Sequence, residues 1–457
     1  MWDEGQARRY YGSRAVRARL WEYLGGTEGG RPTCEYVIGY PPQEGAACPV
    51  RPPAAYRELL AAGMDLARAA WDRRWLVCCL DLDYINFDFR GEAYVQPERV
   101  FSLLEPVRQA VAGVLAGYGV EHLALMTGKG YHFVWQAAHQ DPLVARLACC
   151  GQVPETAAAK YRCDRIRSSR RVDPRSAAAQ HGAGMLMEFI CHQVLAQAPG
   201  ELPLVCSGVT AAGGQRGREV VSLDLSGYAD PLYRHNFRCA FSTHQKAQSE
   251  RSWVGEGIAL GTPVQICLPV GKLELGERLH LQRDQERAAE LAAAATARIP
   301  GAGAGMSRAL QAYLASGLRR CHEHFAAAAE EGWQEGDLAG LPPCAALPLA
   351  APNDLLLQPT HLQTVWRVLA ARGWHPRQVA GLVRSRYEQD HGWGWAWMEC
   401  DAGLRAQAYL RLFHGLSAAG LDRPEEMTCE GHRRRGACPQ PGCGHNLADY
   451  RPRGEAP

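Results

Sequence analysis

Lysine is almost absent from this sequence. Only four of its 50 basic residues are Lys, at positions 129, 160, 246 and 272, and the other 46 are Arg. The codon bias of a GC-rich genome replaces Lys by Arg wherever either residue serves. A lysine that remains is then more often one that the wider, planar guanidinium cannot replace. Two of the four, Lys129 and Lys246, fall in short motifs that also carry histidines.

Long apolar runs and a strong net charge are also missing. No run of about 18 uncharged apolar residues occurs, which argues against a transmembrane helix. The first 30 residues mix acidic and basic side chains and contain no apolar signal-peptide core. The net charge is only +2, so any basic surface must be local. We therefore expect a cytoplasmic protein with no membrane partner.

The composition that is present is that of an ordinary globular protein. Apolar residues make up 47% and charged residues 21% of the 457 positions, which excludes a mainly disordered or collagen-like chain. The odd total of 17 cysteines argues against a framework of disulfides, and in a cytosolic chain most thiols stay reduced.

Two kinds of sequence pattern divide the chain. Strand-like segments (residues 75–83, 123–127, 131–135, 220–225 and 263–269) alternate with helix-like ones (57–71, 97–118 and 179–198), which predicts an α/β or α+β domain over residues 1–299. Residues 300–306 are glycine-rich and read as a flexible linker. From 307 to 457 the periodicity is almost wholly helical, as at residues 362–369, 379–387 and 404–416.

The first chemically informative segment is an apolar strand that ends in two acids. Asp81 and Asp83 lie two residues apart, so their side chains share one face of the strand. Two like charges there are costly unless a cation lies between them. Oxygen ligands suit a divalent cation such as Mg²⁺ or Mn²⁺. The alternative is a solvated strand end.

Two further segments narrow the interpretation. Thr127-Gly-Lys-Gly-Tyr-His132 links two strand-like runs, and its glycines let backbone amides approach a phosphate closely. His132 faces away from the apolar side chains around it. The third segment carries Asp224 on another apolar strand and is followed by several basic residues. Acids and cations of these kinds are what two metals and a triphosphate require.

The order of the three segments resembles the archaeo-eukaryotic primase superfamily, which includes primase-polymerases. The resemblance spans about residues 75–250 and implies a catalytic domain of that type. It implies that Asp81, Asp83 and Asp224 are catalytic metal ligands. It further implies nucleotide contacts from Thr127, Lys129, His132, Arg238, Ser242, His244 and Lys246. Whether Arg234 or Arg238 matches the family's arginine is left open, and no zinc knuckle is expected in this domain.

Four late cysteines form a second group. Cys429, Cys438 and Cys443 lie in a Gly/Pro-rich stretch with little apolar content, where a metal can substitute for a core. A zinc site built from these three thiols and a histidine is one interpretation. With Cys344, which follows two prolines, the pattern resembles the iron–sulfur domain of the primase large subunit. That resemblance implies a 4Fe–4S cluster held by the four cysteines.

Taken together, these patterns predict a single-chain DNA primase-polymerase, a nucleotidyltransferase that makes primers on single-stranded DNA from nucleoside triphosphates by two-metal-ion catalysis. A replicative helicase is a possible further partner. A gap-filling repair polymerase of the same superfamily and a two-metal nuclease are the alternatives. A catalytically inactive nucleic-acid-binding subunit is disfavoured because the acids are intact.

Overall fold

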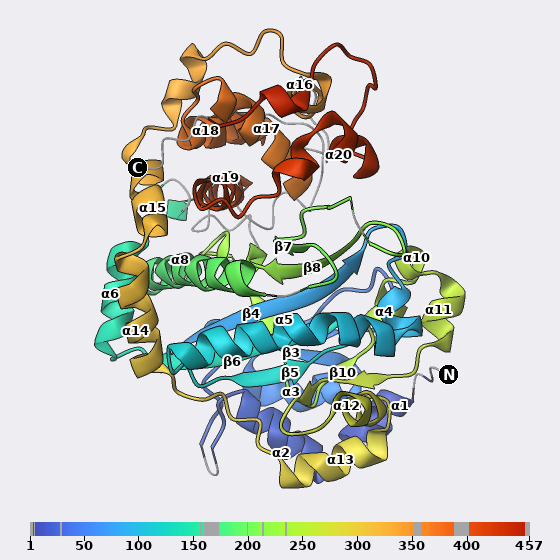
Figure 1. The fold of residues 1–457 in the computed structure, drawn as a ribbon. Helices are drawn as coiled ribbons and strands as arrows, with labels where there is room; N and C mark the ends of the chain where they lie inside the picture. The colour runs from blue at the N-terminus through green and yellow to red at the C-terminus, as the bar shows by residue number, and fades with distance from the viewer. Residues whose placement is uncertain are drawn as a thin grey trace. The chain divides into compact units, whose positions relative to one another are not determined.

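The computed structural model describes the chain except for residues 1–2, 4, 28–29, 156–157, 160–172, 199, 213, 234, 351–357, 388–401 and 453–457 (Figure 1). Helices and β-sheets are both present, which confirms the expected mixed α and β architecture. Two compact units are formed. The first comprises Met1–Ala145, Ala198–Glu201 and Arg234–Ser307, and the second comprises Arg146–Gln197, Leu202–Tyr233 and Arg308–Pro457.

These units differ from the division expected at residues 300–306. The sequence alone assigns all of 1–299 to one domain, whereas most of residues 146–233 group with the C-terminal helices. The chain leaves the first unit within helix α6 (Pro142–Cys150), again after Glu201, and a third time within helix α14 (Gly303–Leu314). A boundary between units that falls inside a helix is not accompanied by a change in amino-acid composition, so the sequence pattern does not reveal it.

The first unit contains two antiparallel arrays of strands. One sheet has the order β2-β1-β3-β9, from β1 (Val37–Tyr40), β2 (Val50–Arg51), β3 (Asp65–Ala69) and β9 (Asn236–Arg238). In the other array β12 (Leu268–Pro269) pairs with β5 (Leu123–Met126), β5 with β6 (Gly130–Ala138), and β6 with β4 (Trp75–Asn86). A short ladder joins β10 (Thr243–His244) to β11 (Gln265–Ile266). The expected strands at residues 75–83, 123–127 and 131–135 are confirmed.

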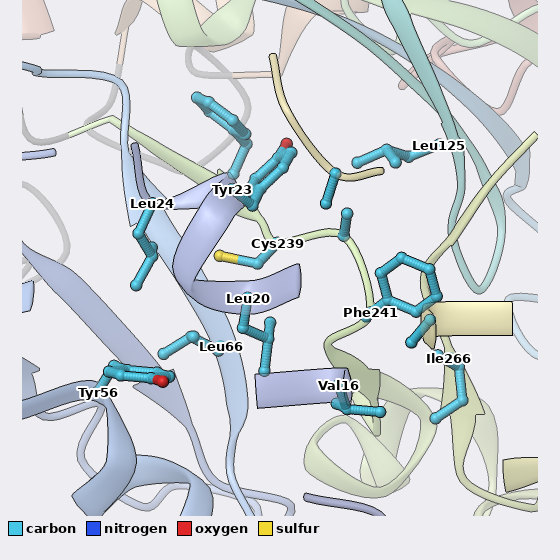
Figure 2. Packing of buried hydrophobic residues seen from close by; sticks show 14 of the residues in the cluster. Val16, Leu20, Tyr23, Leu24, Tyr56, Leu66, Leu125, Cys239, Phe241 and Ile266 are labelled. Carbon is cyan, nitrogen blue, oxygen red and sulfur yellow. The ribbon is translucent and has the colours of Figure 1, made fainter. Parts of the chain in front are cut away.

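Helices complete the first unit. They are α1 (Gln6–Tyr11), α2 (Arg14–Tyr23), α3 (Tyr56–Ala61), α4 (Glu92–Val95), α5 (Pro97–Gly117), α9 (Lys246–Ser249), α10 (Arg251–Val254), α11 (Glu256–Gly261), α12 (Leu275–Leu281) and α13 (Gln285–Ala294). Helix α2 begins after Ser13, whose hydroxyl caps the Val16 amide at 3.5 Å. Its residues Val16, Leu20 and Tyr23, and Leu24 directly after it, are fully buried and pack into a core with Leu66 of β3 (Figure 2).

The expected helix over residues 57–71 is only half right. Helix α3 ends at Ala61, Gly63 adopts φ = +72°, and the chain then forms strand β3. A left-handed residue stops a helix, and glycine adopts that conformation without a Cβ penalty. Every residue of β3 is buried, so the strand shows no alternation of polar and apolar side chains. The glycine was the one signal that could have revealed this boundary.

Helix α5 alone among the described helices is long and apolar enough to cross a membrane by length and composition. Its buried side chains include Phe101, Leu104 and Val111, and the helix packs against β4 and β6. A core helix that covers a sheet passes the same test of length and composition, so α5 is weak evidence for a membrane segment.

The second unit is mainly helical. It contains α8 (Pro174–Gln197), α15 (Gly317–Ala327), α16 (Pro343–Ala350), α17 (Pro359–Ala371), α18 (Pro376–Tyr387), α19 (Ala402–Ala418) and α20 (Cys429–Arg434). Strands β7 (Leu204–Cys206) and β8 (Glu219–Asp224) pair in parallel. Helices α17, α18 and α19 confirm the helices expected at residues 362–369, 379–387 and 404–416. Their apolar positions pack together, since α18 and α17 both contact α19.

The glycine-rich segment at 300–306 is not a free linker in this structure. The carbonyl oxygen of Pro300 accepts a hydrogen bond from the Gln136 amide at 3.0 Å, and the Ala302 amide donates to the Gln136 carbonyl at 2.8 Å. These bonds tie the segment to β6, and α14 begins at Gly303. A Cβ on Gly305 would overlap the carbonyl oxygen of Gly119. The glycines here allow close packing, which composition alone cannot distinguish from flexibility.

Gly305 and Gly301 therefore provide a matched pair of substitutions. Alanine in a helix normally stabilises a protein by about 1 kcal/mol relative to glycine. For Gly305→Ala we expect instead a loss of about 1–3 kcal/mol in the free energy of unfolding, because the added methyl overpacks against backbone. Gly301→Ala, whose Cβ would meet no atom within 4 Å, should change stability by less than about 1 kcal/mol. Urea denaturation measures both. A neutral or stabilising Gly305→Ala would restore the flexible-linker interpretation.

Candidate functional site

The register of β4 and β6 places the first two predicted motifs side by side. Asp81 lies opposite His132, and Asp83 lies opposite Gly130. A Cβ on Gly130 would overlap the carbonyl oxygen of Leu82, so this register requires glycine at position 130. The turn between β5 and β6 closes with a 2.8 Å hydrogen bond from the Thr127 amide to the Gly130 carbonyl. Local geometry thus holds the Thr-Gly-Lys-Gly turn beside both acids.

Each of the two acids on β4 has a basic partner from the neighbouring segment. Lys129 Nζ lies 2.8 Å from Asp83 Oδ2, and His132 Nε2 lies 3.5 Å from Asp81 Oδ1. Burial alone would raise the pKa of Asp83, but Lys129, Lys246 and His132 outweigh it and hold that pKa below its usual value. Asp83 is therefore ionised at neutral pH.

His132 is neutral at the same pH. Burial chiefly lowers its pKa to about 4, and the nearby positive charge of Arg238 lowers it further. Its Nδ1 is buried and has no hydrogen-bond partner among the residues that the structure describes. A neutral imidazole with an unused ring nitrogen can donate or accept one hydrogen bond to a ligand.

His244 lies on the other side of the same turn. A Cβ on Gly128 would overlap the His244 ring, so the glycine makes room for the histidine. The ring is buried, and burial and then Arg238, Lys246 and Lys129 lower its pKa well below the usual value. Within the described part of the chain, His244 Nδ1 has no hydrogen-bond partner. The structure thus brings a second neutral imidazole to the turn.

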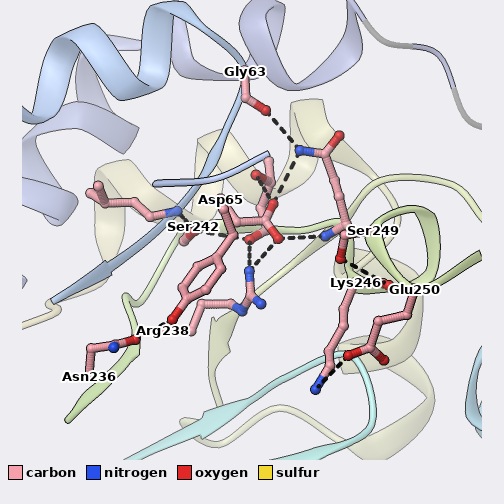
Figure 3. A network of polar contacts seen from close by, with 12 residues as sticks. Gly63, Asp65, Asn236, Arg238, Ser242, Lys246, Ser249 and Glu250 are labelled. Atoms are coloured by element: carbon pink, nitrogen blue, oxygen red, sulfur yellow. Dashed lines mark hydrogen bonds and ion pairs between the residues drawn. The ribbon is translucent and has the colours of Figure 1, made fainter. Parts of the chain in front are cut away.

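Asp65 on β3 organises the third motif (Figure 3). Its carboxylate is 1% exposed and forms an ion pair with Arg238. It also accepts hydrogen bonds from Thr243 Oγ1 at 2.7 Å and from the Gln245 amide at 2.8 Å. Asp65 was missed by sequence analysis because it lies in the segment expected to be helical. A buried aspartate just after Gly63 was the available signal.

Lys246 completes the basic groups of this motif. Its Nζ lies 3.5 Å from Oε1 of Glu250, the residue that follows α9 (Figure 3). Lys129 and then burial lower the pKa of Lys246, which means that the two lysines act on each other electrostatically. Lys129, Lys246 and Arg238 therefore form one cationic group next to the acids of β4. Such a group attracts a polyanion.

Two residues that were predicted to contact the nucleotide, Ser242 and Thr127, form hydrogen bonds within the protein in this structure. Ser242 is fully buried, and its hydroxyl accepts a hydrogen bond from the Leu66 amide at 2.7 Å and donates to the Thr243 carbonyl at 2.9 Å. Thr127 is 4% exposed, and its carbonyl accepts a 2.6 Å hydrogen bond from Gln282 Nε2. Both residues fix the loops that carry the charged side chains. Arg234, the alternative to Arg238, lies outside the described residues.

Asp224, the third predicted metal ligand, belongs to the second unit, at the end of β8. Its Oδ1 accepts a hydrogen bond from the Ser226 amide at 2.8 Å, and its Oδ2 accepts one from the Ser226 hydroxyl at 2.9 Å. The carboxylate thus caps the turn that follows its strand. The strand expected at residues 220–225 is confirmed, with bounds Glu219–Asp224.

The four late cysteines come together in the second unit. Burial and, to a smaller extent, Cys438, Cys429 and Cys443 together raise the pKa of the Cys344 thiol to about 12, so the four cysteines are close enough to interact electrostatically. All four are free thiols. The Leu447 amide donates a hydrogen bond to Cys429 Sγ at 3.3 Å. An amide that points at a sulfur stabilises a thiolate ligand.

Metal-ligand geometry itself is not formed by the described side chains: no group of three or more His, Cys, Asp or Glu residues among them has the spacing to hold an ion. The donor chemistry nevertheless fits, with carboxylates in the first unit and four neighbouring thiols in the second. Comparisons with protein families, with curated proteins and with solved structures found no match to this chain.

The buried Asp65–Arg238 pair yields a test of this arrangement. Asp65→Asn removes one charge of a buried pair and leaves Arg238 uncompensated, so we expect the free energy of unfolding to fall by about 3–5 kcal/mol. Glu250→Gln removes the partner of Lys246, but Glu250 is 45% exposed, so the expected loss is below about 1 kcal/mol. Urea denaturation of both variants measures the difference. Equal stabilities would show that Asp65 does not hold the third motif in place.

Proposed function

We propose that this chain is a primase-polymerase that synthesises primers on single-stranded DNA by nucleotidyl transfer. One observation carries the proposal: the segments around Asp81–Asp83 and Lys129–His132 meet the basic residues Arg238–Lys246 in the first unit, while Asp224 of the third segment belongs to the second unit. Asp83 interacts electrostatically with Lys129, Lys246 and His132, and His244 interacts with Arg238 and both lysines. Paired acids beside three cations and two neutral imidazoles suit a metal–triphosphate substrate.

In this proposal Asp81 and Asp83 hold Mg²⁺ or Mn²⁺, and Asp224 of the second unit is a metal ligand only by the resemblance to the primase superfamily. Bound divalent cations would stabilise the negative charge on the attacking hydroxyl oxygen and on the leaving pyrophosphate. The ionised state of Asp83, which the neighbouring cations maintain, is the state that a metal ligand needs. Lys129 already neutralises Asp83, so this lysine and a metal ion would share the carboxylate's negative charge.

The cationic group would bind the triphosphate. Lys246 is partly exposed and its ion pair with Glu250 is long at 3.5 Å, so it can turn toward phosphate oxygens. Arg238 is held by Asp65 and provides a fixed positive charge. Neutral His132 and His244 can each donate one N–H to a phosphate oxygen. A bound polyanion would also raise the pKa of both imidazoles, which strengthens that interaction when they protonate.

The helical second unit supplies a separate part of the proposal. Its four neighbouring thiols would hold a 4Fe–4S cluster, with zinc as the alternative metal. Cys344 is buried at the start of α16, and Cys429 begins α20, so thiolate ligation would fix these two helices to each other. Metal binding releases the thiol protons and so offsets the raised pKa of Cys344.

Primer synthesis is tested with purified protein, single-stranded DNA, labelled nucleotides and Mg²⁺ or Mn²⁺. We expect unprimed oligonucleotide products from the wild type and a loss of about a hundredfold or more in Asp81→Asn, Asp83→Asn and Asp224→Asn. Asp88→Asn, in the exposed loop after β4, is the matched control and should retain synthesis. Extension of a supplied primer without unprimed products would indicate a gap-filling polymerase. DNA cleavage without nucleotide use would indicate a nuclease.

The metal in the second unit is tested by purification without oxygen. We expect brown protein with broad visible absorbance and with iron and sulfide in comparable amounts. Cys344→Ser, Cys429→Ser, Cys438→Ser and Cys443→Ser should each lose the colour, and Cys48→Ser, an exposed cysteine of the first unit, should keep it. Colourless protein with one zinc ion would replace the cluster by the zinc site. Unchanged metal content in all four variants would exclude these ligands.

A further inference from the structure

A cavity of about 290 Å³ lies inside the second unit, and neither the four late cysteines nor Asp224 lines it. It is bordered by the end of α6 and by α8, α15, α18 and α19. Three arginines line it: Arg319, Arg377 and Arg411. Glu323 is the one carboxylate among the described residues that line it. The lining therefore carries an excess of positive charge in a space at the lower end of the size range for small-ligand pockets.

Arg411 is fixed in place by buried partners. Its Nε donates a hydrogen bond to Glu188 Oε2 at 3.2 Å, and its Nη1 lies 2.9 Å from His181 Nε2. Glu188 is 1% exposed and lies behind the cavity wall, where His322 Nε2 is 3.0 Å from its other oxygen. A buried carboxylate that holds an arginine in one orientation preorganises the guanidinium for a ligand.

The other two arginines are less constrained. Arg319 Nε donates to Glu323 Oε1 at 2.7 Å, and Arg377 Nη1 donates to the Ala326 carbonyl at 3.3 Å. Arg377 Nε is buried and finds no hydrogen-bond partner among the described residues. Both side chains keep donor groups for an anion. Guanidinium groups recognise phosphate oxygens in pairs of parallel hydrogen bonds.

Two histidines, His181 and His322, also line the cavity. Burial and the charge of Arg411 lower the pKa of His181 to about 3, and burial lowers the pKa of His322. Both rings are neutral at pH 7 and add no charge of their own. Met185, Phe325 and Ala327 are apolar residues of the same lining. The lining thus combines cationic and apolar side chains.

We propose that this cavity binds a small ligand that carries phosphate groups, through Arg319, Arg377 and Arg411. Apolar side chains in the lining can contact an organic part, so the ligand is either a nucleoside phosphate or a free inorganic diphosphate. Three arginines face one carboxylate, Glu323, among the described residues of the lining, and this excess of cations suits an anionic ligand. This site is separate from the acids of β4 and does not depend on the proposed polymerase activity.

Binding is measured by calorimetry on the full chain with inorganic pyrophosphate and with ADP, in EDTA so that no divalent cation contributes. We expect Arg319→Gln and Arg377→Gln to weaken binding by about tenfold or more each, because each removes a charge-assisted contact. Arg320→Gln, an exposed arginine next to Arg319 that does not line the cavity, is the matched control and should bind normally. Both cavity arginines are partly exposed, so these variants should fold.

The remaining arms identify the ligand and the site. Lys129→Gln separates the two sites: it should remove only binding that belongs to the first unit, and it should leave the binding that is lost in Arg319→Gln and Arg377→Gln. Tighter binding of ADP than of pyrophosphate would assign the cavity to a nucleotide, and equal binding would assign it to the diphosphate alone. Binding of neither ligand, or unchanged affinity in both Arg319→Gln and Arg377→Gln, would overturn the proposal. Loss of binding only in Lys129→Gln would also overturn it.

Discussion

The antiparallel register of β4 and β6 is the constraint on which the candidate site depends. Gly130 permits β6 to approach Leu82 closely, and this pairing sets Asp81 opposite His132. A shift of one residue would turn Asp81 and Asp83 toward the opposite face of the strand pair and would separate Asp83 from Lys129. Gly128 adds a second close approach, because it leaves room for the His244 ring. Two glycines thus bring together charged side chains from three distant segments.

The charge on Asp65 extends this arrangement to the third motif. Arg238 and Asp65 are 173 residues apart, and their buried pair, with the hydrogen bonds to Thr243 and Gln245, fixes the loop between β9 and α9. A buried carboxylate with four donors tolerates low dielectric, whereas the same group unpaired would not. Ser242, which lies in this loop, adds a further link, because its hydroxyl accepts a hydrogen bond from the Leu66 amide of β3. The loop therefore presents His244 and Lys246 in one orientation.

Sequence patterns predicted those strands and helices that are determined by residues near one another in the chain. Strands β4, β5, β6 and β8 were predicted because apolar runs and turn residues mark them, and α17, α18 and α19 because their apolar positions repeat at helical spacing. Strand β3 was not, since all its residues are buried and it lacks alternation. The role of Asp65 depends on a partner far along the chain. Likewise, residues 300–302 owe their order to Gln136, and no feature of a glycine-rich segment reveals that contact.

The scarcity of lysine gains a physical interpretation from these contacts. Lys129 meets Asp83 at 2.8 Å in a turn where glycines pack closely against neighbouring groups, and a compact ammonium fits there more readily than a planar guanidinium. Arg238 occupies a different environment: its Nη1 donates to the buried carboxylate of Asp65 and to the Thr243 carbonyl, so its pairing is fixed. Lys246 is instead partly exposed and lies 3.5 Å from its partner Glu250. In the proposed function the fixed cation of this site is therefore an arginine, and the two lysines are the compact cations that can exchange a carboxylate for a phosphate.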